Sequence, residues 1–333
     1  MTPGGPSAKR LYAVGGRQAV RVQQNAPAVG YEARYDLALV VEIDVPRRSV
    51  HRVFEYETPL DCRPDEDPAI LFKSATLADG LLYVPTQTEV VVYRVPDFQQ
   101  VGYLSVPMFN DVHHARPSPE GGVVIANTGL DMVVDLSLDG SVRREWSAID
   151  ESPWVRFSRA IDYRKVRSTK PHAAHPNHVF YVDDELWVTR FNQRDAISLT
   201  RPGRRIDIGV EGVHDGLVYG DHIYFTTVDG KVVIAGKDTL AVESVIDLRT
   251  FYPPDTLVGW TRGIAVDDHG FWVGFSRVRY TRFRENLGWA MRAFKHEPRT
   301  RIAYFDLSKG AVGPSFELES AGMNAVFSVL VAD

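Results

Sequence analysis

Histidine is unevenly distributed along this 333-residue chain. Six of the ten histidines fall in three short stretches, NDVHHARP, HAAHPNH and EGVHDG. They are His113, His114, His172, His175, His178 and His214. Imidazoles that meet near one axis can exchange protons near neutral pH, and they also bind transition metals. The three stretches therefore predict acid–base chemistry or a metal site, provided that the fold brings them together.

These stretches occupy equivalent places in a degenerate repeat. The second strand of each unit contains an aromatic or aliphatic residue, which we use as an anchor. The residue ten positions before each anchor is polar. The last strand of the chain supplies another polar residue at the matching place. The set is Lys73, His114, Asn177, His214, Arg262 and Asn324. Two permanent cations without a carboxylate predict a cavity for an anion such as carboxylate, phosphate or sulfate. A wet channel lined by polar side chains without a function is the alternative that stays open.

The residue types suggest a role for each position. Lys73 and Arg262 are expected to bind the anion, whereas His114 and His214 transfer protons and Asn177 and Asn324 orient a polar group. Arginines and aromatics in the neighbouring loops are expected to complete the substrate site. These additional substrate-binding residues are Trp260, Arg277 and Arg279.

A transition metal is an alternative use of the histidines. The expected ligands are His114, His175, His178 and His214. The spacing HAAHPNH differs from a helical HxxxH motif, so the sequence does not decide between a metal ion and no cofactor. Calcium is disfavoured because hard cations need oxygen ligands, which this ring supplies only as amides. Strand alternation places His114 in the channel and turns His113 into the neighbouring blade.

The elements that must position these residues are short strands. Anchors at Tyr83, Val124, Trp187, Tyr224 and Trp272 each follow an Asp/Gly-rich turn, as in tight hairpins. Units of about 40 to 50 residues made of four strands indicate propeller blades. The predicted blades span residues 9–56 plus 323–331, 68–106, 110–148, 171–209, 212–249 and 259–319. Only 284–295 has the pattern of a short helix.

The two chain ends complement one another. The N-terminal unit lacks a first strand, and MNAVFSVLV at the C-terminus is a first strand with nothing after it. We therefore predict an all-β, single-domain, six-bladed β-propeller in which the C-terminal strand closes the N-terminal blade. A pair of β-sandwiches is the alternative. The long insertions all fall in connections on one face: 17–36, 57–67, 149–170, 250–258 and 276–298.

Two of these insertions are rich in arginine and aromatic residues. Residues 156–170 and 276–301 interleave both types on the predicted site face, which suits a lid over an anionic or sugar-bearing ligand. A solvated surface loop is the simpler interpretation.

Composition excludes several classes of protein. A net charge of -5 argues against nucleic acid or an anionic membrane as partner. Cys62 is the single cysteine, so no intrachain disulfide can form, and its acidic loop disfavours a thiolate nucleophile. We find no GxSxG elbow, P-loop or dinucleotide fingerprint, and so expect no nucleotide cofactor.

Without a signal-peptide core or a long apolar run, we expect a cytoplasmic protein. Oligomeric state stays open.

Two stretches resemble a known family. GWTRGIA at 259–265 and VGFSRVR at 273–279 are similar to the TRGxA and VGxSxVR signature of an uncharacterised family of bacterial propeller proteins. HPNH at 175–178 and DELWV at 184–188 resemble the HPHS and DGRLW stretches of that family, with Asn177 replacing its second histidine. More loosely, the layout resembles the gluconolactonase and strictosidine synthase superfamily. The acidic metal ligands expected there have no counterpart in the polar ring.

The sequence thus supports two hypotheses of different class. The first is a lyase or hydrolase that acts on a small or conjugated anionic substrate at the channel mouth, with or without a transition metal. The second is a non-catalytic binding module that recognises an anionic glycan or protein through its basic, aromatic-rich face.

Overall fold

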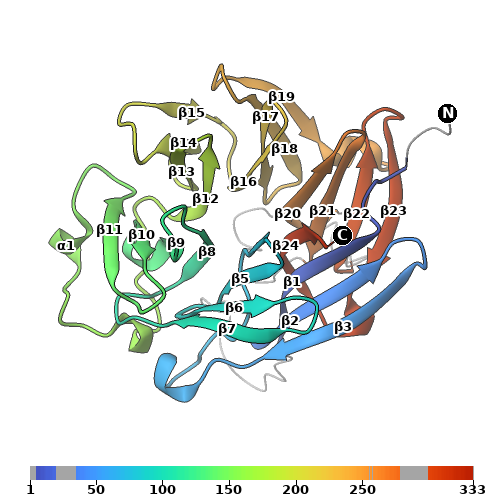
Figure 1. The fold of residues 1–333 in the computed structure, drawn as a ribbon. Helices are drawn as coiled ribbons and strands as arrows, with labels where there is room; N and C mark the ends of the chain where they lie inside the picture. The colour runs from blue at the N-terminus through green and yellow to red at the C-terminus, as the bar shows by residue number, and fades with distance from the viewer. Residues whose placement is uncertain (1–4, 20–34, 255, 257, 278–298, 333) are drawn as a thin grey trace, which may run out of the picture.

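Four-stranded antiparallel sheets follow one another around a central axis (Figure 1). The computed structural model describes residues 5–19, 35–254, 256, 258–277 and 299–332. Within these ranges, 24 strands form six sheets, and the predicted six-bladed β-propeller is confirmed. The alternative of paired sandwiches is wrong, because each sheet packs its faces against the sheets on either side of it.

The first three blades follow the chain from its N-terminus. The first contains β24 (Ala325–Val331), β1 (Arg10–Gln18), β2 (Tyr35–Asp44) and β3 (Ser49–Tyr56). The second contains β4 (Thr76–Ala78), β5 (Leu81–Pro85), β6 (Val90–Arg94) and β7 (Gln99–Leu104). The third contains β8 (Val112–Pro117), β9 (Val123–Asn127), β10 (Met132–Leu136) and β11 (Val142–Ser147).

The remaining three blades repeat this order. The fourth contains β12 (Pro176–Val182), β13 (Glu185–Arg190), β14 (Asp195–Ser198) and β15 (Arg205–Asp207). The fifth contains β16 (Val213–Tyr219), β17 (His222–Thr227), β18 (Lys231–Gly236) and β19 (Val242–Asp247). The sixth contains β20 (Trp260–Asp267), β21 (Gly270–Ser276), β22 (Arg301–Asp306) and β23 (Ala311–Glu317).

Short helical turns occur in the connections. They are η1 (Leu60–Cys62), η2 (Thr128–Leu130), α1 (Pro153–Arg156), η3 (Tyr163–Lys165), η4 (Leu248–Phe251) and η6 (Glu319–Ala321). The helix expected over 284–295 lies outside the described residues. No helix in the described part of the chain is long and apolar enough to cross a membrane.

The C-terminal strand closes the ring. β24 pairs antiparallel with β1 from Leu11 opposite Val331 to Gly16 opposite Ala325, as predicted. At Gly15 the two strands approach so closely that a Cβ atom would lie 1.9 Å from the carbonyl oxygen of Ala325. Only glycine permits this approach. Closure therefore removes the two sheet edges that an open ring would expose.

Apolar residues fill the spaces between neighbouring blades. In one such cluster Phe180 and Trp187 of the fourth blade pack against Ile223 and Phe225 of the fifth. Truncating a large buried side chain of this kind typically costs about 3–5 kcal/mol of stability. These interblade layers make the inner strands a rigid frame for the side chains that line the axis.

Candidate functional site

Two cavities lie one after the other along the inner strands. The first, which we call the mouth pocket, has a volume of about 740 Å³. Its polar and aromatic lining residues include Lys73, Asp111, His113, Lys170, His172, His175, Phe191, His214, Trp260, Arg262 and Phe327. The second, which we call the distal cavity, has a volume of about 220 Å³ and lies farther along the same strands. Its polar lining residues are Thr76, His114, Arg116, His178, Tyr181, Asp215 and Ser328.

Bulges in the inner strands assign neighbouring polar residues to different cavities. In β8 the pairing with β9 shifts between Val112 and His114, so His113 lines the mouth pocket and His114 the distal cavity. The expectation that only His114 faces the channel is therefore wrong. A bulge interrupts strand alternation and lets two consecutive side chains point toward the axis. Similar shifts occur in β12, β16 and β20.

The two predicted asparagines line neither cavity. Asn177 lies in the bulge of β12, where its Nδ2 donates a hydrogen bond of 2.9 Å to the carbonyl oxygen of Val213. Asn324 precedes β24, and its Oδ1 accepts a hydrogen bond of 2.6 Å from the backbone N–H of Gln18. Both amides therefore join neighbouring segments of the scaffold.

The other predicted substrate residues have mixed outcomes. Lys73, His214, Trp260 and Arg262 line the mouth pocket. Arg277 lines neither cavity and forms an ion pair with Glu319, with Nε 2.5 Å from Oε1. Arg279 lies outside the described residues.

The basic loop over 156–170 is mostly neutralised by its own acids and those nearby. Its ion pairs are Arg156–Asp131, Arg159–Glu145, Arg164–Asp162, Lys165–Asp65 and Arg167–Asp67. Of the six basic residues in this loop, only Lys170 lines the mouth pocket. Most of the loop charge therefore stabilises the loop itself.

Asp111 is the acidic centre of the mouth pocket and was missed among the candidate residues. Its carboxylate forms a buried ion pair with the Lys73 ammonium and lies 4.0 Å from Nε2 of His172. Burial opposes its ionisation, but Lys73 and the surrounding histidines hold the pKa of Asp111 well below its usual value. Burial lowers the pKa of Lys73, whereas Asp111 opposes that shift. The signal in the sequence was an aspartate two residues before His113.

His113 presents a basic nitrogen to the mouth pocket. Its Nδ1 lies 2.8 Å from the carbonyl oxygen of Asp111, which can only accept a hydrogen bond. Nδ1 therefore carries the proton of the neutral ring, and Nε2 carries the lone pair. Burial, and then the charge of Lys73, lower the pKa of His113 well below its usual value. The ring thus stays neutral at pH 7.

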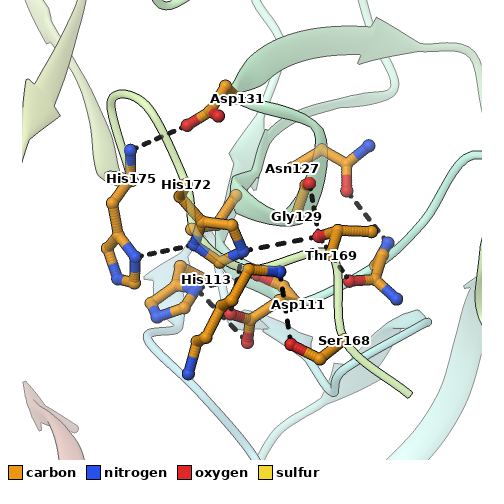
Figure 2. A network of polar contacts seen from close by, with 12 residues as sticks. Asp111, His113, Asn127, Gly129, Asp131, Ser168, Thr169, His172 and His175 are labelled. Carbon is orange, nitrogen blue, oxygen red and sulfur yellow. Dashed lines mark hydrogen bonds and ion pairs between the residues drawn. The ribbon is translucent and has the colours of Figure 1, made fainter. Parts of the chain in front are cut away.

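His172 and His175 form a hydrogen-bonded pair that Thr169 orients (Figure 2). The single hydrogen of the Thr169 hydroxyl is donated to the carbonyl oxygen of Gly129 at 2.5 Å, so in the 3.4 Å contact with Nε2 of His172 the ring nitrogen is the donor. Nδ1 of His172 then accepts the 2.8 Å hydrogen bond from Nδ1 of His175. This leaves a lone pair on Nε2 of His175. Burial lowers the pKa of His175 to about 3.

Asp131 holds the turn that carries these two rings. Its carboxylate accepts hydrogen bonds of 2.7 to 2.8 Å from the backbone N–H groups of Ala173, Ala174 and His175. Figure 2 shows Asp131 above the His172–His175 pair. His175 itself has a positive φ of 56°, a conformation that residues other than glycine adopt only when their surroundings hold them. Asp131 supplies that restraint.

Cations outnumber acids in the mouth pocket. Lys73, Lys170 and Arg262 face a single carboxylate, that of Asp111, among the described lining residues. The Arg262 guanidinium lies over the Phe327 ring at 4.8 Å from its centre. Burial, and then Arg262, lower the pKa of His214 well below its usual value. With the histidines neutral, the described lining residues carry more positive than negative charge, which favours an anionic ligand.

The four predicted metal ligands do not meet. His175 and His214 line the mouth pocket, whereas His114 and His178 line the distal cavity. Within the described ranges, no group of three His, Cys, Asp or Glu side chains is placed to hold a metal ion.

Comparisons with known proteins identify a fold and no family. No protein-family model matches the chain, and the comparison with curated proteins finds no match. A solved protein of unknown function from Bacteroides caccae is similar over 97% of this chain and 98% of its own, with a TM-score of 0.59 and 10% identity. A streptogramin B lyase aligns over 86% of this chain and 78% of its own, with a TM-score of 0.48 and 12% identity.

A third solved structure is a catalytically inactive virginiamycin B lyase from Staphylococcus aureus with quinupristin. It aligns over 93% of this chain and 87% of its own, with a TM-score of 0.49 and 11% identity. At such low identity, similarity extends to the fold alone. The chain therefore shares the fold of the Bacteroides caccae protein, and its chemistry must be argued from its own residues.

Proposed function

We propose that the mouth pocket is the active site of a lyase that removes a proton from a small anionic substrate. The observation that carries this proposal is a pair of neutral histidines, His113 and His175, each with a lone pair on Nε2, in a pocket whose described lining also includes lysine and arginine side chains. A neutral imidazole with a free lone pair can accept a proton, as a general base must. The cations are suited to a carboxylate substrate and to the negative charge that develops as the proton leaves.

The reaction is written as an elimination. His113 Nε2 takes a proton from the carbon next to the substrate carboxylate. The electron pair of that C–H bond forms a new C=C bond, and the bond to the leaving group on the adjacent carbon breaks with its electron pair. Arg262 and Lys170 bind the carboxylate, and the Lys73 ammonium lies beside the base.

Elimination is favoured over hydrolysis through a covalent intermediate. No serine, threonine or cysteine occurs among the described residues that line the mouth pocket, so the usual hydroxyl and thiol nucleophiles are missing from it. Elimination needs only a base and a means of stabilising negative charge.

The test uses a panel of small carboxylates that carry a leaving group on the carbon β to the carboxylate. Purified protein is incubated with each in D₂O, and absorbance and NMR report the new double bond and exchange at the α-carbon. For any substrate that reacts, His113→Ala should lower kcat/KM by about 10²–10⁴-fold. The control is His222→Ala, at the start of β17 in the fifth blade, where the side chain is 42% exposed and lines neither cavity.

Several outcomes would contradict the proposal. They are full activity of His113→Ala, a product that has gained water instead of a double bond, and a panel without any reaction. Anion binding without turnover that survives the His113→Ala change would instead favour a non-catalytic binding module.

A further inference from the structure

The distal cavity contains a cation for which the described residues supply no anionic partner. Arg116 lines it near the end of β8, and its Nε is buried without a hydrogen-bond partner among the described residues. The guanidinium lies over the Tyr181 ring at 4.7 Å from its centre, and no carboxylate in the described part of the chain pairs with it. Burial lowers the pKa of Arg116, which reflects the cost of holding this charge away from water.

The threonine and histidine side chains that share the distal cavity with Arg116 are neutral and supply hydrogen-bonding groups. Nδ1 of His114 accepts a hydrogen bond of 3.2 Å from the backbone N–H of Val179, so its Nε2 carries the proton and donates to Oγ1 of Thr76 at 3.0 Å. The hydrogen of the Thr76 hydroxyl is then available to a ligand. His178 stacks on His114 with ring centres 3.5 Å apart, and its Nδ1 is buried without a partner among the described residues.

The acid of the distal cavity is already engaged. Oδ2 of Asp215 accepts hydrogen bonds from the Thr226 hydroxyl and from the backbone N–H of Gly263, the latter at 2.9 Å. Burial raises the pKa of Asp215, and these two hydrogen bonds oppose that shift. Its other oxygen lies 4.0 Å from Nδ1 of His178, beyond hydrogen-bond range. Within the described residues, Asp215 therefore forms no ion pair with Arg116.

The rest of the wall is apolar, and the cavity opens to solvent. Leu77, Phe180, Leu217, Ile264 and Leu330 supply much of the lining. Leu77, Leu217 and Leu330 are partly exposed, which places the opening at the end of the inner strands away from the mouth pocket. A volume of about 220 Å³ suits a small organic molecule.

We infer that the distal cavity is a second binding site, which takes a small carboxylate with an apolar body. The planar guanidinium of Arg116 matches a carboxylate through two parallel hydrogen bonds, and the Thr76 hydroxyl adds a third donor. The apolar wall covers the remainder of the ligand. Such binding does not depend on the reaction proposed for the mouth pocket.

The test is calorimetric titration with benzoate and butyrate at constant ionic strength. The wild type should bind benzoate saturably, and Arg116→Met should weaken binding at least about 10-fold, as expected for the loss of a charged hydrogen-bonding partner. Arg262→Met and His113→Ala change only the mouth pocket and should leave unchanged the benzoate binding that is lost in Arg116→Met. Arg116→Lys keeps the charge without the planar fork and should have intermediate affinity.

Thermal unfolding separates binding from folding. Without a ligand, Arg116→Met should melt at the same temperature as the wild type or higher, because it removes an unpaired buried charge. Benzoate should raise the melting temperature of the wild type and not that of Arg116→Met. The inference is overturned if neither carboxylate binds, if Arg116→Met binds as well as the wild type, or if Arg262→Met abolishes binding. Tighter binding of inorganic phosphate than of benzoate would overturn the carboxylate preference.

Discussion

At the residue scale, burial controls the charge of the channel histidines. It is the largest cause of the lowered pKa values of His113, His114 and His214, and it lowers those of His175 and His178 to about 3. A neutral ring keeps one lone pair, and its neighbours decide which nitrogen holds it. His113 therefore offers a base in the mouth pocket, whereas the lone pair of His114 is occupied by a backbone N–H.

Lowered histidine pKa values make stability fall in acid. Between the unfolded value of about 6.5 and the lower folded value, the unfolded chain binds more protons, so the free energy of unfolding decreases as pH falls. For His178, with a folded pKa of about 3, the contribution lost between pH 6.5 and pH 5 is about 2 kcal/mol. The pKa of Asp215 is raised, so its contribution to the free energy of unfolding has the opposite sign. That contribution is present at low pH and is lost as the pH rises.

Urea unfolding at pH 7, 6 and 5 tests this sign. The wild type should lose stability steadily, and His178→Gln should have a shallower dependence on pH by up to about 1.4 kcal/mol per unit. His222→Gln, at a partly exposed position, is the matched control. Identical pH dependence in His178→Gln and the wild type would contradict a depressed pKa at His178.

At the scale of elements, the strand bulges and one turn build the site. The bulge in β8 gives His113 to one cavity and His114 to the other, and β16 similarly separates His214 from Asp215. The turn before β12 carries His172 and His175, and the carboxylate of Asp131 from the third blade holds its backbone. Asp131 is thus a positioning residue for the fourth blade.

Replacing Asp131 tests this positioning. In Asp131→Asn, an amide N–H₂ must face at least one backbone N–H, so the turn loses a hydrogen bond and two donors oppose each other. We expect a loss of about 1–3 kcal/mol in unfolding free energy and at least about a tenfold fall in kcat for a substrate of the mouth pocket. Asp135→Asn is the control. Asp135 lies on β10 and is buried like Asp131, but its carboxylate accepts a hydrogen bond from the Ser118 hydroxyl. Equal effects of the two changes would show that Asp131 has no specific role in the site.

At the scale of the whole molecule, ring closure completes both cavities. β24 joins β1 and contributes Phe327 to the mouth pocket and Ser328 to the distal cavity. Strands β1 and β24, which are far apart in the sequence, therefore lie side by side next to the axis (Figure 1). Both sites should form only when the ring is closed.

Gly15→Ala should weaken closure. The new Cβ would lie 1.9 Å from the carbonyl oxygen of Ala325, so the backbone of β1 or β24 must move. We expect a loss of about 1–3 kcal/mol in unfolding free energy, together with weaker benzoate binding in the distal cavity. Gly5→Ala is the control, because nothing lies within 4 Å of the corresponding Cβ. Unchanged stability and binding in Gly15→Ala would contradict a tight closure at this point.

The sequence by itself determined the architecture, since the evidence for it is local. Asp/Gly turns before Tyr83, Trp187 and Trp272 recur at the blade period, and the unpaired first strand at 323–331 predicts closure. Lys73, His214 and Arg262 of the predicted ring line one pocket, and their roles in it stay a prediction.

Only the tertiary structure decided which side chains share a cavity. Constant spacing from the anchors assumes regular alternation, but bulges in β8 and β12 shift His113 into the mouth pocket and His178 into the distal cavity. Two contacts join different blades: the ion pair of Asp111 with Lys73, and the hydrogen bond of Asp131 to the turn that carries His175. Neither follows from spacing along the chain, because a bulge and an interblade contact are set by the packing of neighbouring strands.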